Sequence, residues 1–237
     1  MNGNEIINEL KKMSDEKYKK NIIKLGIPED RCIGVPMADL RKFSKNIKKD
    51  NDLARELWIS GYHEAMLLSV LIMDKKSVTL EYIEEIMNDV ISWDLCDHLC
   101  KNIIIKIKGY EDLIYKWSSS EKLYYKRAAF TLIASYVIHN KKADDEALNK
   151  MLQIIEENSD DDREHVKKAV LWALKEIGKK DMEWKDKAAK VSNKLISSGI
   201  KSKVWIGNNA LKELNTLVKV EGRTRLISNK SKMGSNV

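Results

Sequence analysis

The sequence is poor in the residues that interrupt helices. Only two prolines, Pro28 and Pro36, and ten glycines occur among its 237 residues. Both residue types disfavour the interior of a helix, so their scarcity argues against a fold built on many tight turns. No segment shows the alternation of apolar and polar residues that marks a half-buried strand. With Leu, Ile, Lys, Glu and Ala prominent, the composition predicts an almost entirely helical protein.

Cysteines and long apolar runs are also scarce. The three cysteines, Cys32, Cys96 and Cys100, are odd in number and lack the spacing of a disulfide framework, which indicates free thiols in a reducing compartment. No apolar stretch reaches the length of a membrane span, and the N-terminus lacks the apolar core of a signal peptide. We therefore expect a cytoplasmic protein without a membrane partner, and we expect it to be a monomer.

Positive charge exceeds negative charge only moderately. Lys and Arg number 43 against 36 Asp and Glu, which gives a formal net charge of +7. Such an excess favours a polyanion as partner. The alternative, a lysine-rich protein whose charges merely solvate its helices, is open on composition alone.

Amphipathic helical patterns follow one another with short polar joints between them. Ser14 is expected to cap the second helix, and Pro36 is expected to be the first residue of the third. The polar, basic tail, residues 219–237, is expected to be disordered. The expected helices span residues 4–13, 15–25, 36–47, 52–59, 62–73, 80–90, 93–107, 111–117, 121–138, 144–157, 163–177, 183–196 and 203–217.

About a dozen short helices favour helix pairs stacked in series, because a single bundle of this size would use fewer and longer helices. Residues that depart from the apolar pattern, Trp93, Arg127, Trp172 and Trp205, recur at intervals of 34, 45 and 33 residues, within the range of two-helix HEAT-type repeats. The expected fold is therefore all-α, an α-solenoid of HEAT-like helix pairs that forms a single domain over residues 1–218. The concave, basic face of such an array would suit a long ligand.

The run from Ser92 to Leu99 pairs an aromatic ring with a carboxylate. Trp93 and Asp97 are four residues apart at the start of a helix, which places them side by side. A ring and a carboxylate on a basic surface suggest chemistry on a cationic base in nucleic acid. In the alternative interpretation, Trp93 packs half-buried and Asp97 makes only a surface ion pair with Lys101.

Cys96 and Cys100 lie one turn apart, with His98 between them in the sequence. His98 points to a different side of the helix, and no fourth ligand is evident. Two ligands on one helix do not close the coordination sphere of a zinc ion. We therefore expect no metal site.

Trp172 lies on the polar side of its helix. The apolar stripe of residues 163–177 points away from it, so core packing explains an indole there poorly. A neighbouring helix could still cover the ring, because solenoid helices bury two flanks. The surrounding residues form an expected basic face, which comprises His165, Lys168, Lys175 and Lys179.

Arg127 is expected to face outward, because the apolar stripe of its helix lies nearly opposite. Its planar guanidinium can bridge phosphate oxygens in a geometry that lysine cannot match. Tyr124, one turn earlier, is placed to support it. A guanidinium that is simply solvated is the alternative.

Several of these segments, taken in order, resemble the AlkD-type DNA alkylation repair proteins, which are HEAT-like DNA glycosylases. The resemblance extends from Ile22 to Leu217. Its segments are Gly-Val-Pro-Met-Ala-Asp-Leu-Arg at 34–41, Tyr-His-Glu-Ala at 62–65, Ser-Trp-Asp-Leu-Cys-Asp at 92–97, Lys-Arg-Ala-Ala at 126–129 and Lys-Lys-Ala-Val-Leu-Trp-Ala-Leu-Lys-Glu at 167–176.

The resemblance implies a role for each of four residues. Trp93 and Trp172 match the two active-site tryptophans of the family, Asp97 its catalytic aspartate and Arg127 its DNA-backbone arginine. Members of the family remove cationic N3- and N7-alkylpurines from duplex DNA without the base flipping that is usual among glycosylases. Two residues depart from the family pattern. Ser92 stands where relatives can carry an aromatic residue, and Met66 stands where Arg or Gln is common. These departures concern catalytic efficiency and substrate range more than the class of reaction.

The sequence thus predicts a monofunctional DNA glycosylase that needs no metal or organic cofactor and acts on double-stranded DNA with alkylated bases. A cationic purine leaves without protonation, and the Asp97 carboxylate would stabilise the positive charge that develops on the sugar. The two tryptophans would hold the cationic nucleotide. The residues expected to bind DNA are Arg127, Lys168, Lys175, Lys179, Tyr124 and Lys101.

Three alternatives share the fold. A non-excising relative that binds branched or distorted DNA would keep the solenoid and its lysines. A protein-binding HEAT scaffold would need an apolar groove and would bind with little dependence on salt. An RNA-binding role has the weakest support, because no aromatic platform for single strands is evident.

Overall fold

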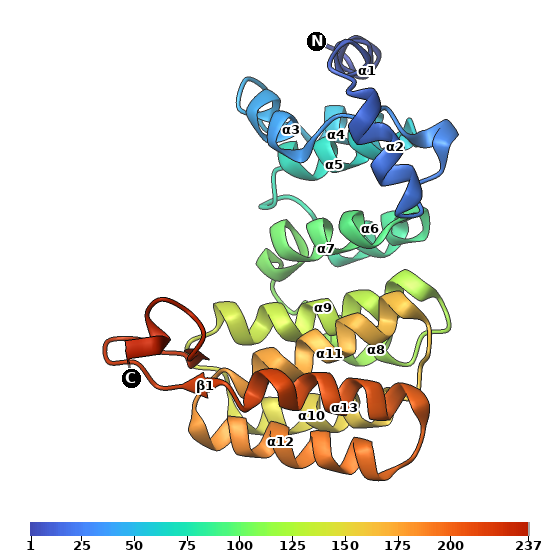
Figure 1. Ribbon diagram of the computed structural model, residues 1–237. Helices are drawn as coiled ribbons and strands as arrows, with labels where there is room; N and C mark the ends of the chain where they lie inside the picture. The colour runs from blue at the N-terminus through green and yellow to red at the C-terminus, as the bar shows by residue number, and fades with distance from the viewer. Residues whose placement is uncertain (237) are drawn as a thin grey trace. The chain divides into compact units, whose positions relative to one another are not determined.

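The computed structural model describes residues 1–236. They form thirteen α-helices, four short 3-10 helices and one two-stranded hairpin (Figure 1). The chain divides into two compact units, residues 1–110 and residues from 111 onward, each with a packed interior of its own. The fold is all-α and consists of packed helix pairs, as the sequence predicts.

Helix α5, His63–Ile72, is the centre of the first unit. It packs along α4, Asn51–Ile59, and contacts both α3, Met37–Ser44, and α7, Trp93–Asn102. Helices α3, α5 and α7 therefore make up one layer of this unit. The remaining helices of the unit are α1, Gly3–Lys12; α2, Glu16–Lys24; α6, Leu80–Ile86; η1, Glu29–Arg31; η2, Met87–Asp89; and η3, Ile104–Lys106.

The sequence of α5 explains this central place. Its residues are His-Glu-Ala-Met-Leu-Leu-Ser-Val-Leu-Ile, and nine of the ten are buried. A helix that is apolar on all sides is stable only when neighbours cover every side. Its first two residues, His63 and Glu64, are polar yet only 2% and 1% exposed, so each needs hydrogen-bond partners inside the unit.

The second unit repeats the pairing more regularly. Helix α9, Leu123–His139, packs against α11, Glu164–Gly178, which packs against α13, Lys201–Leu214. Behind this layer, α8 pairs with α9, α10 with α11 and α12 with α13, as Figure 1 shows. The bounds of the second layer are α8, Glu111–Ser118; α10, Asp145–Glu157; and α12, Met182–Ser197.

Two glycines allow α13 to approach its neighbours closely. A Cβ on Gly207 would meet the Ser192 carbonyl of α12, and a Cβ on Gly178 would meet the side chain of Leu214. Leu214 is fully buried, so it has little room to move. Glycine is therefore required at both positions by packing, although it weakens a helix interior.

Two details of the helix starts differ from expectation. The cap of α2 is Asp15, whose side chain accepts from the Tyr18 amide, whereas Ser14 donates to the Ile33 carbonyl at 2.6 Å. Pro36 lies just before α3, at its N-cap, instead of being the first helical residue. In both cases the helix begins one residue later than its composition suggests.

The expectation of a disordered tail is wrong for residues 219–236. Strand β1, Leu217–Val218, pairs antiparallel with β2, Ile227–Ser228, and a 3-10 turn, η4, spans Gly234–Asn236. The apolar residues Leu217 and Leu226 are each 2% exposed. Their burial supplies the stabilisation that the polar composition of the tail conceals.

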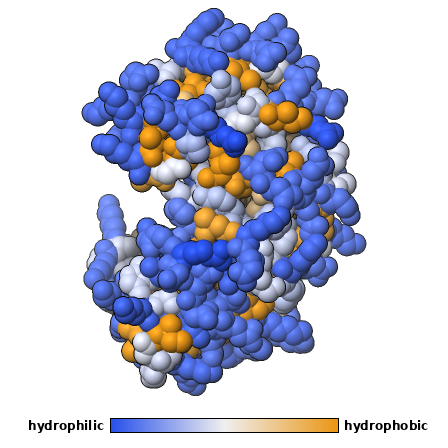
Figure 2. Space-filling view, turned by 90° about the vertical axis from the view of Figure 1, so that its right-hand side faces the viewer, coloured by the Kyte–Doolittle hydropathy of each residue, from blue (hydrophilic) through white to orange (hydrophobic). Residues whose placement is uncertain are grey.

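Hydrophilic residues dominate the face of the molecule seen in Figure 2, with small apolar patches among them. No helix within residues 1–236 has the length and apolar character needed to cross a membrane. The expectation of a single domain over residues 1–218 stays a prediction.

Candidate functional site

The start of α7 presents the two residues singled out in the first unit. Ser92 caps the helix, and its hydroxyl accepts from the Leu95 amide at 3.3 Å. Trp93 is the first helical residue and is 36% exposed, whereas Asp97, one turn later, is 8% exposed. The expected pairing of an accessible ring with a carboxylate along one side of the helix is thus present.

A buried histidine holds this helix start in place. His63, at the beginning of α5, lies 3.0 Å from Asp94 Oδ2 through Nε2 and 3.4 Å from Ser92 Oγ through Nδ1. Burial raises the pKa of Asp94, but the hydrogen bond and the electrostatic attraction of His63, together with hydrogen bonds from Ser92 and the Leu95 amide, outweigh it, and the net shift is downward. The residues on either side of Trp93 are therefore both tied to one imidazole.

The next residue of α5 binds a different segment. Glu64 accepts from the backbone amides of Gly34 at 2.6 Å and Ile33 at 2.8 Å, with Val35 at 3.3 Å. These hydrogen bonds satisfy a carboxylate that is 1% exposed. The Tyr-His-Glu-Ala segment, residues 62–65, thus connects the loop before α3 with the first turn of α7. Sequence reasoning had assigned neither His63 nor Glu64 a partner.

Asp97 also makes the contact that the simpler interpretation predicts. Lys101 Nζ lies 3.4 Å from Asp97 Oδ2, and the lysine side chain is 43% exposed. An ion pair with an exposed lysine is worth less than about 1 kcal/mol. Lys101, expected to bind DNA, is thus a partner of the carboxylate.

Positive groups surround His98 on the same helix. Burial, then Arg41 of α3 and Lys101, lower the pKa of His98 to about 4, against the opposing effect of Asp94 and Asp97. The imidazole is therefore neutral at pH 7. Cys96 and Cys100 are buried free thiols, and within residues 1–236 no group of three or more His, Cys, Asp or Glu side chains is arranged to hold a metal ion.

In the second unit, the expectation that Arg127 faces outward is wrong. The residue is 6% exposed, and Nη1 donates to the His165 carbonyl at 2.6 Å. The cause is the position of α9, whose residues from Arg127 to Val137 are all buried between neighbouring helices. The Tyr124 ring lies 6.3 Å from the His165 ring, centre to centre. Tyr124 and Arg127 thus meet the same residue of α11.

Trp172 is half-buried on α11, and its indole has a partner that the sequence did not suggest. Nε1 donates to Glu176 Oε1 at 3.3 Å, one turn along the helix. Glu176 itself is 7% exposed and also accepts from Lys179 at 2.9 Å. The four-residue spacing of Trp172 and Glu176 was the available signal for this contact.

The basic face expected around Trp172 is largely neutralised. Lys175 forms an ion pair with Glu213 of α13, and Lys179 approaches the same carboxylate at 2.5 Å. Burial lowers the pKa of Lys179, but hydrogen bonds to Glu213 and Glu176 outweigh it and raise the pKa. Lys168 is 58% exposed and lies 3.0 Å from Glu164. Of the three predicted lysines, only Lys168 extends into solvent.

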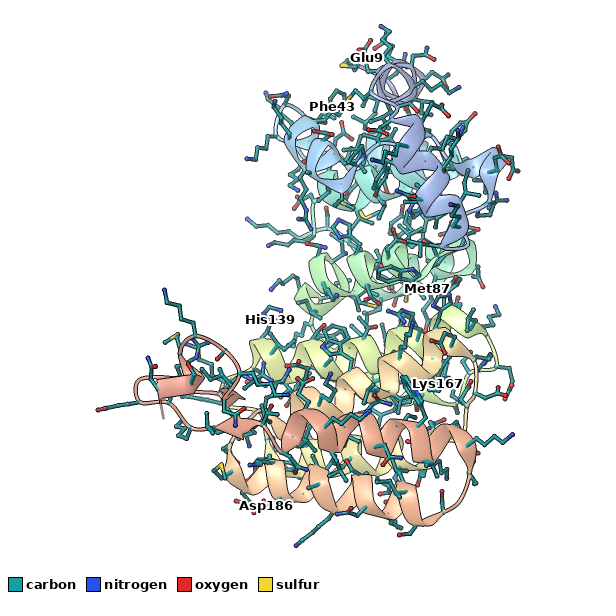
Figure 3. The ribbon with its side chains drawn as sticks, viewed as in Figure 1. Glu9, Phe43, Met87, His139, Lys167 and Asp186 are labelled. Atoms are coloured by element: carbon teal, nitrogen blue, oxygen red, sulfur yellow. The ribbon has the colours of Figure 1, made fainter. Side chains whose placement is uncertain are left out.

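A further aromatic residue of the second unit has a cation above it. Lys167 of α11, labelled in Figure 3, places Nζ 4.8 Å from the centre of the Trp205 ring on α13. Such a contact is a cation–π interaction between neighbouring helices. Trp205, the fourth residue of the expected repeat, therefore has a role in packing.

The described geometry allows a specific kind of chemistry in the first unit. A largely buried carboxylate stabilises a nearby positive charge more strongly than a solvated one, because little water screens it. An accessible indole one turn away can contact a cationic ring system. Trp93 and Asp97 thus suit a cationic ligand. In the second unit, Arg127 and Tyr124 both contact His165, whereas Trp172 contacts Glu176.

Comparison with known proteins identifies the family of this chain. A family model described as DNA alkylation repair enzyme matches residues 6–204. Among solved structures, the chain is similar to one described as representing "a new family of proteins related to the HEAT-like repeat DNA glycosylases with affinity for branched DNA structures", with a TM-score of 0.72 and 18% sequence identity over 100% of this chain and 94% of that chain. Comparison with curated proteins gave no match. The family match covers α1 to α12, including the helices that carry Trp93, Asp97, Arg127 and Trp172, and the chain therefore belongs to the DNA alkylation repair enzyme family.

Proposed function

We propose that the protein is a monofunctional DNA glycosylase that hydrolyses the N-glycosidic bond of cationic N3- and N7-alkylpurines in duplex DNA. The observation that carries the proposal is the pairing of Asp97, 8% exposed, with Trp93, 36% exposed, on the first turns of α7. Membership of the alkylation repair family supports the same assignment.

The substrate explains why few catalytic groups are needed. A purine alkylated at N3 or N7 already carries a positive charge, so it leaves as a neutral base without a proton from the enzyme. Positive charge then develops on the deoxyribose, where the Asp97 carboxylate stabilises it and orients a water molecule toward C1′. The products are a free alkylpurine and an abasic site.

The aromatic residues and Arg127 have supporting roles in this proposal. Trp93 and Trp172 contact the cationic nucleotide through their ring faces, an interaction worth about 0.5–2 kcal/mol. Arg127, 6% exposed, supports this region by donating to the His165 carbonyl and so joining α9 to α11. Lys168, with its exposed side chain, adds a salt-dependent phosphate contact.

The decisive experiment measures base release. The purified protein is incubated in excess with duplex DNA that carries N7-methylguanine, and the free base is followed over time. We expect release of N7-methylguanine and no release from matched duplexes that carry uracil, because uracil lacks the positive charge that weakens the glycosidic bond of an alkylated purine. Absence of release from both substrates would contradict the proposal, and efficient release of uracil would contradict its mechanism.

A second candidate function is binding of branched DNA without excision. It is favoured by one observation, the description of the structurally similar protein as having affinity for branched DNA structures. The two functions separate in one comparison, in which binding to a four-way junction and to a duplex of equal length is measured beside base release. Preference for the junction together with no release would favour the second candidate.

A further inference from the structure

The C-terminal hairpin returns to the end of α11. Arg225 donates from Nη2 to Glu176 Oε2 at 2.7 Å and to the Glu176 carbonyl at 2.8 Å. The carboxylate is largely shielded from water, since Glu176 is 7% exposed, and charge-assisted hydrogen bonds are stronger in such surroundings. The hairpin thus holds one oxygen of a buried carboxylate.

The other oxygen of this carboxylate holds Trp172. Oε1 of Glu176 accepts from the indole Nε1 at 3.3 Å and from Lys179 Nζ at 2.9 Å. Trp172 is only half-buried, so packing alone leaves freedom in the direction of its ring. The hydrogen bond to Glu176 Oε1 therefore contributes to the orientation of the indole.

Arg225 is itself fixed by its neighbours. The Leu226 amide donates to the Lys179 carbonyl at 2.8 Å, and the Leu226 side chain is 2% exposed. Lys185 of α12 donates to the Leu217 carbonyl at 3.1 Å, at the base of the hairpin. These contacts attach the hairpin to two helices. It lies outside residues 6–204, the segment that matches the family model.

We propose that Arg225 is a positioning residue for Trp172, and that the C-terminal hairpin completes this part of the site. Arg225 sets the side-chain rotamer of Glu176, because its Nη2 donates hydrogen bonds to both the carboxylate and the backbone carbonyl of that residue. Without it, the remaining charged partner is Lys179, which also contacts Glu213. The consequence for excision rests on the proposed function, whereas the effect on the indole does not.

The test follows the indole N–H of Trp172 by nuclear magnetic resonance in the full-length protein. Six tryptophans give indole signals in a nitrogen-15 spectrum, and the signal lost in Trp172→Phe identifies Trp172. Arg225→Met removes the donors but keeps an apolar stem of similar length. We expect it to shift the Trp172 signal and to leave that of Trp58, which donates to Asp89, unchanged.

Arg223→Met is the matched control, because it removes the same charge from the same hairpin. Arg223 is exposed, and its side chain contacts Met233 instead of a carboxylate. A Trp172 signal that is unmoved in Arg225→Met, or that moves equally in Arg223→Met, would overturn the proposal. The Leu226 amide signal reports whether the hairpin stays attached to α11. If the hairpin detaches in Arg225→Met, the test is made with Arg225→Lys instead. A Trp172 signal in Arg225→Lys that is identical to that of the unmodified protein would overturn the proposal.

A kinetic measurement extends the test to function. If Trp172 is mispositioned, single-turnover excision should slow by about 10-fold in Arg225→Met, with duplex affinity equal to that of Arg223→Met. Equal excision rates in the two variants would contradict a positioning role. If the unmodified protein releases no base, the proposed function fails, while the nuclear magnetic resonance measurement still tests the link between Arg225 and Trp172.

Discussion

The two tryptophan regions hold their rings in opposite ways. Trp93 projects from the first turn of α7, 36% exposed, and Asp97 beside it has an ion pair with one exposed lysine. Trp172 lies half-buried in a network of three cations, Lys175, Lys179 and Arg225, and two carboxylates. The ion pair of the α7 carboxylate thus joins residues of one helix, whereas the charges of the α11 region come from α11, α13 and the hairpin and act on one another.

The difference also concerns distance along the chain. The cap of α7 and the pair of Asp97 with Lys101 join residues three or four positions apart. The Trp172 network instead depends on Glu213 from α13 and Arg225 from the hairpin, the latter 49 positions from Glu176. Substitutions on α7 should therefore change chemistry at one place, while those around α11 should change how several helices fit together.

The largest effect is expected for Asp97→Asn. The substitution keeps the shape of the side chain but removes the charge that stabilises the developing sugar cation. Single-turnover excision should fall by about 100-fold or more, equivalent to about 3 kcal/mol. Duplex affinity should stay the same or increase, because a carboxylate repels phosphate. Asp52→Asn, at an exposed carboxylate of α4, serves as the control, and full activity in Asp97→Asn would exclude the assigned mechanism.

Lowering the pH to mildly acidic values should reduce the stabilisation contributed by the α7 region before that contributed by the α11 region. The pKa of His98 is about 4 in the folded state and about 6.5 when unfolded, so the unfolded chain binds the extra proton between these values. The free energy of unfolding should thus fall as pH decreases through this window, by about 2 kcal/mol between pH 7 and pH 5. Lys175 and Lys179 lower the pKa of Glu213 despite its burial, so the α11 network loses stability only at lower pH.

Denaturant titrations at pH 7 and pH 5 measure this effect. His98→Gln should remove most of the difference between the two curves. His139→Gln, at an exposed histidine at the end of α9 (Figure 3), should retain it. An unchanged difference in His98→Gln would show that another group titrates in this window.

Loss of the α7 cap should have a smaller effect on stability but a specific effect on Trp93. Ser92→Ala removes the N-cap and the contact with His63, which should lower the free energy of unfolding by about 1 kcal/mol. Thr79→Ala removes the comparable cap of α6, where Thr79 accepts from Tyr82, without affecting His63. Both variants should unfold at lower denaturant, but only Ser92→Ala should shift the Trp93 indole signal. A shift in both would indicate general loosening of the unit.

The smallest expected effect concerns duplex affinity, which should depend on an exposed lysine but not on a lysine that is paired with a carboxylate. Lys168→Ala should lower duplex affinity about 2- to 3-fold and reduce the slope of log affinity against log salt by about one, as expected for loss of one phosphate contact. Lys175→Ala should leave this slope unchanged, because Glu213 already pairs with Lys175. Affinity titrations at several salt concentrations measure both, and equal slopes for the two variants would contradict the distinction.

Local patterns predict the helices and the pairing of Trp93 with Asp97, because their determinants lie within one or two helical turns. The contacts of His63 with Ser92 and Asp94 join segments 29 and 31 positions apart and were outside such patterns. The expected ranges match the observed helices to within a few residues, apart from the segments from Met87 and Ile104, where a 3-10 turn replaces the end of the expected helix. The placement of Trp93 beside Asp97 follows from spacing alone.

Residues whose environment comes from distant segments escape such patterns. Arg127 is opposite the apolar stripe of its own helix, yet α9 is covered on that side as well, so the periodicity of a single helix misjudges it. Lys175 and Lys179 form a basic face in sequence, but Glu213, more than 30 positions later, neutralises it. Arg225 lies in a tail whose polar composition hides the buried Leu226.

Gly207, in the interior of α13, is a position where a substitution that favours helix formation would not stabilise the protein. Helix propensity alone recommends Gly207→Ala as a stabilising change of about 1 kcal/mol, and an engineer would choose such a position early. Here the added methyl group would meet the Ser192 carbonyl, and α13 would have to move away from α12. Because α13 also carries Glu213, that movement would draw the carboxylate away from Lys175 and Lys179. One missing methyl group therefore sets the spacing on which a whole charge network depends.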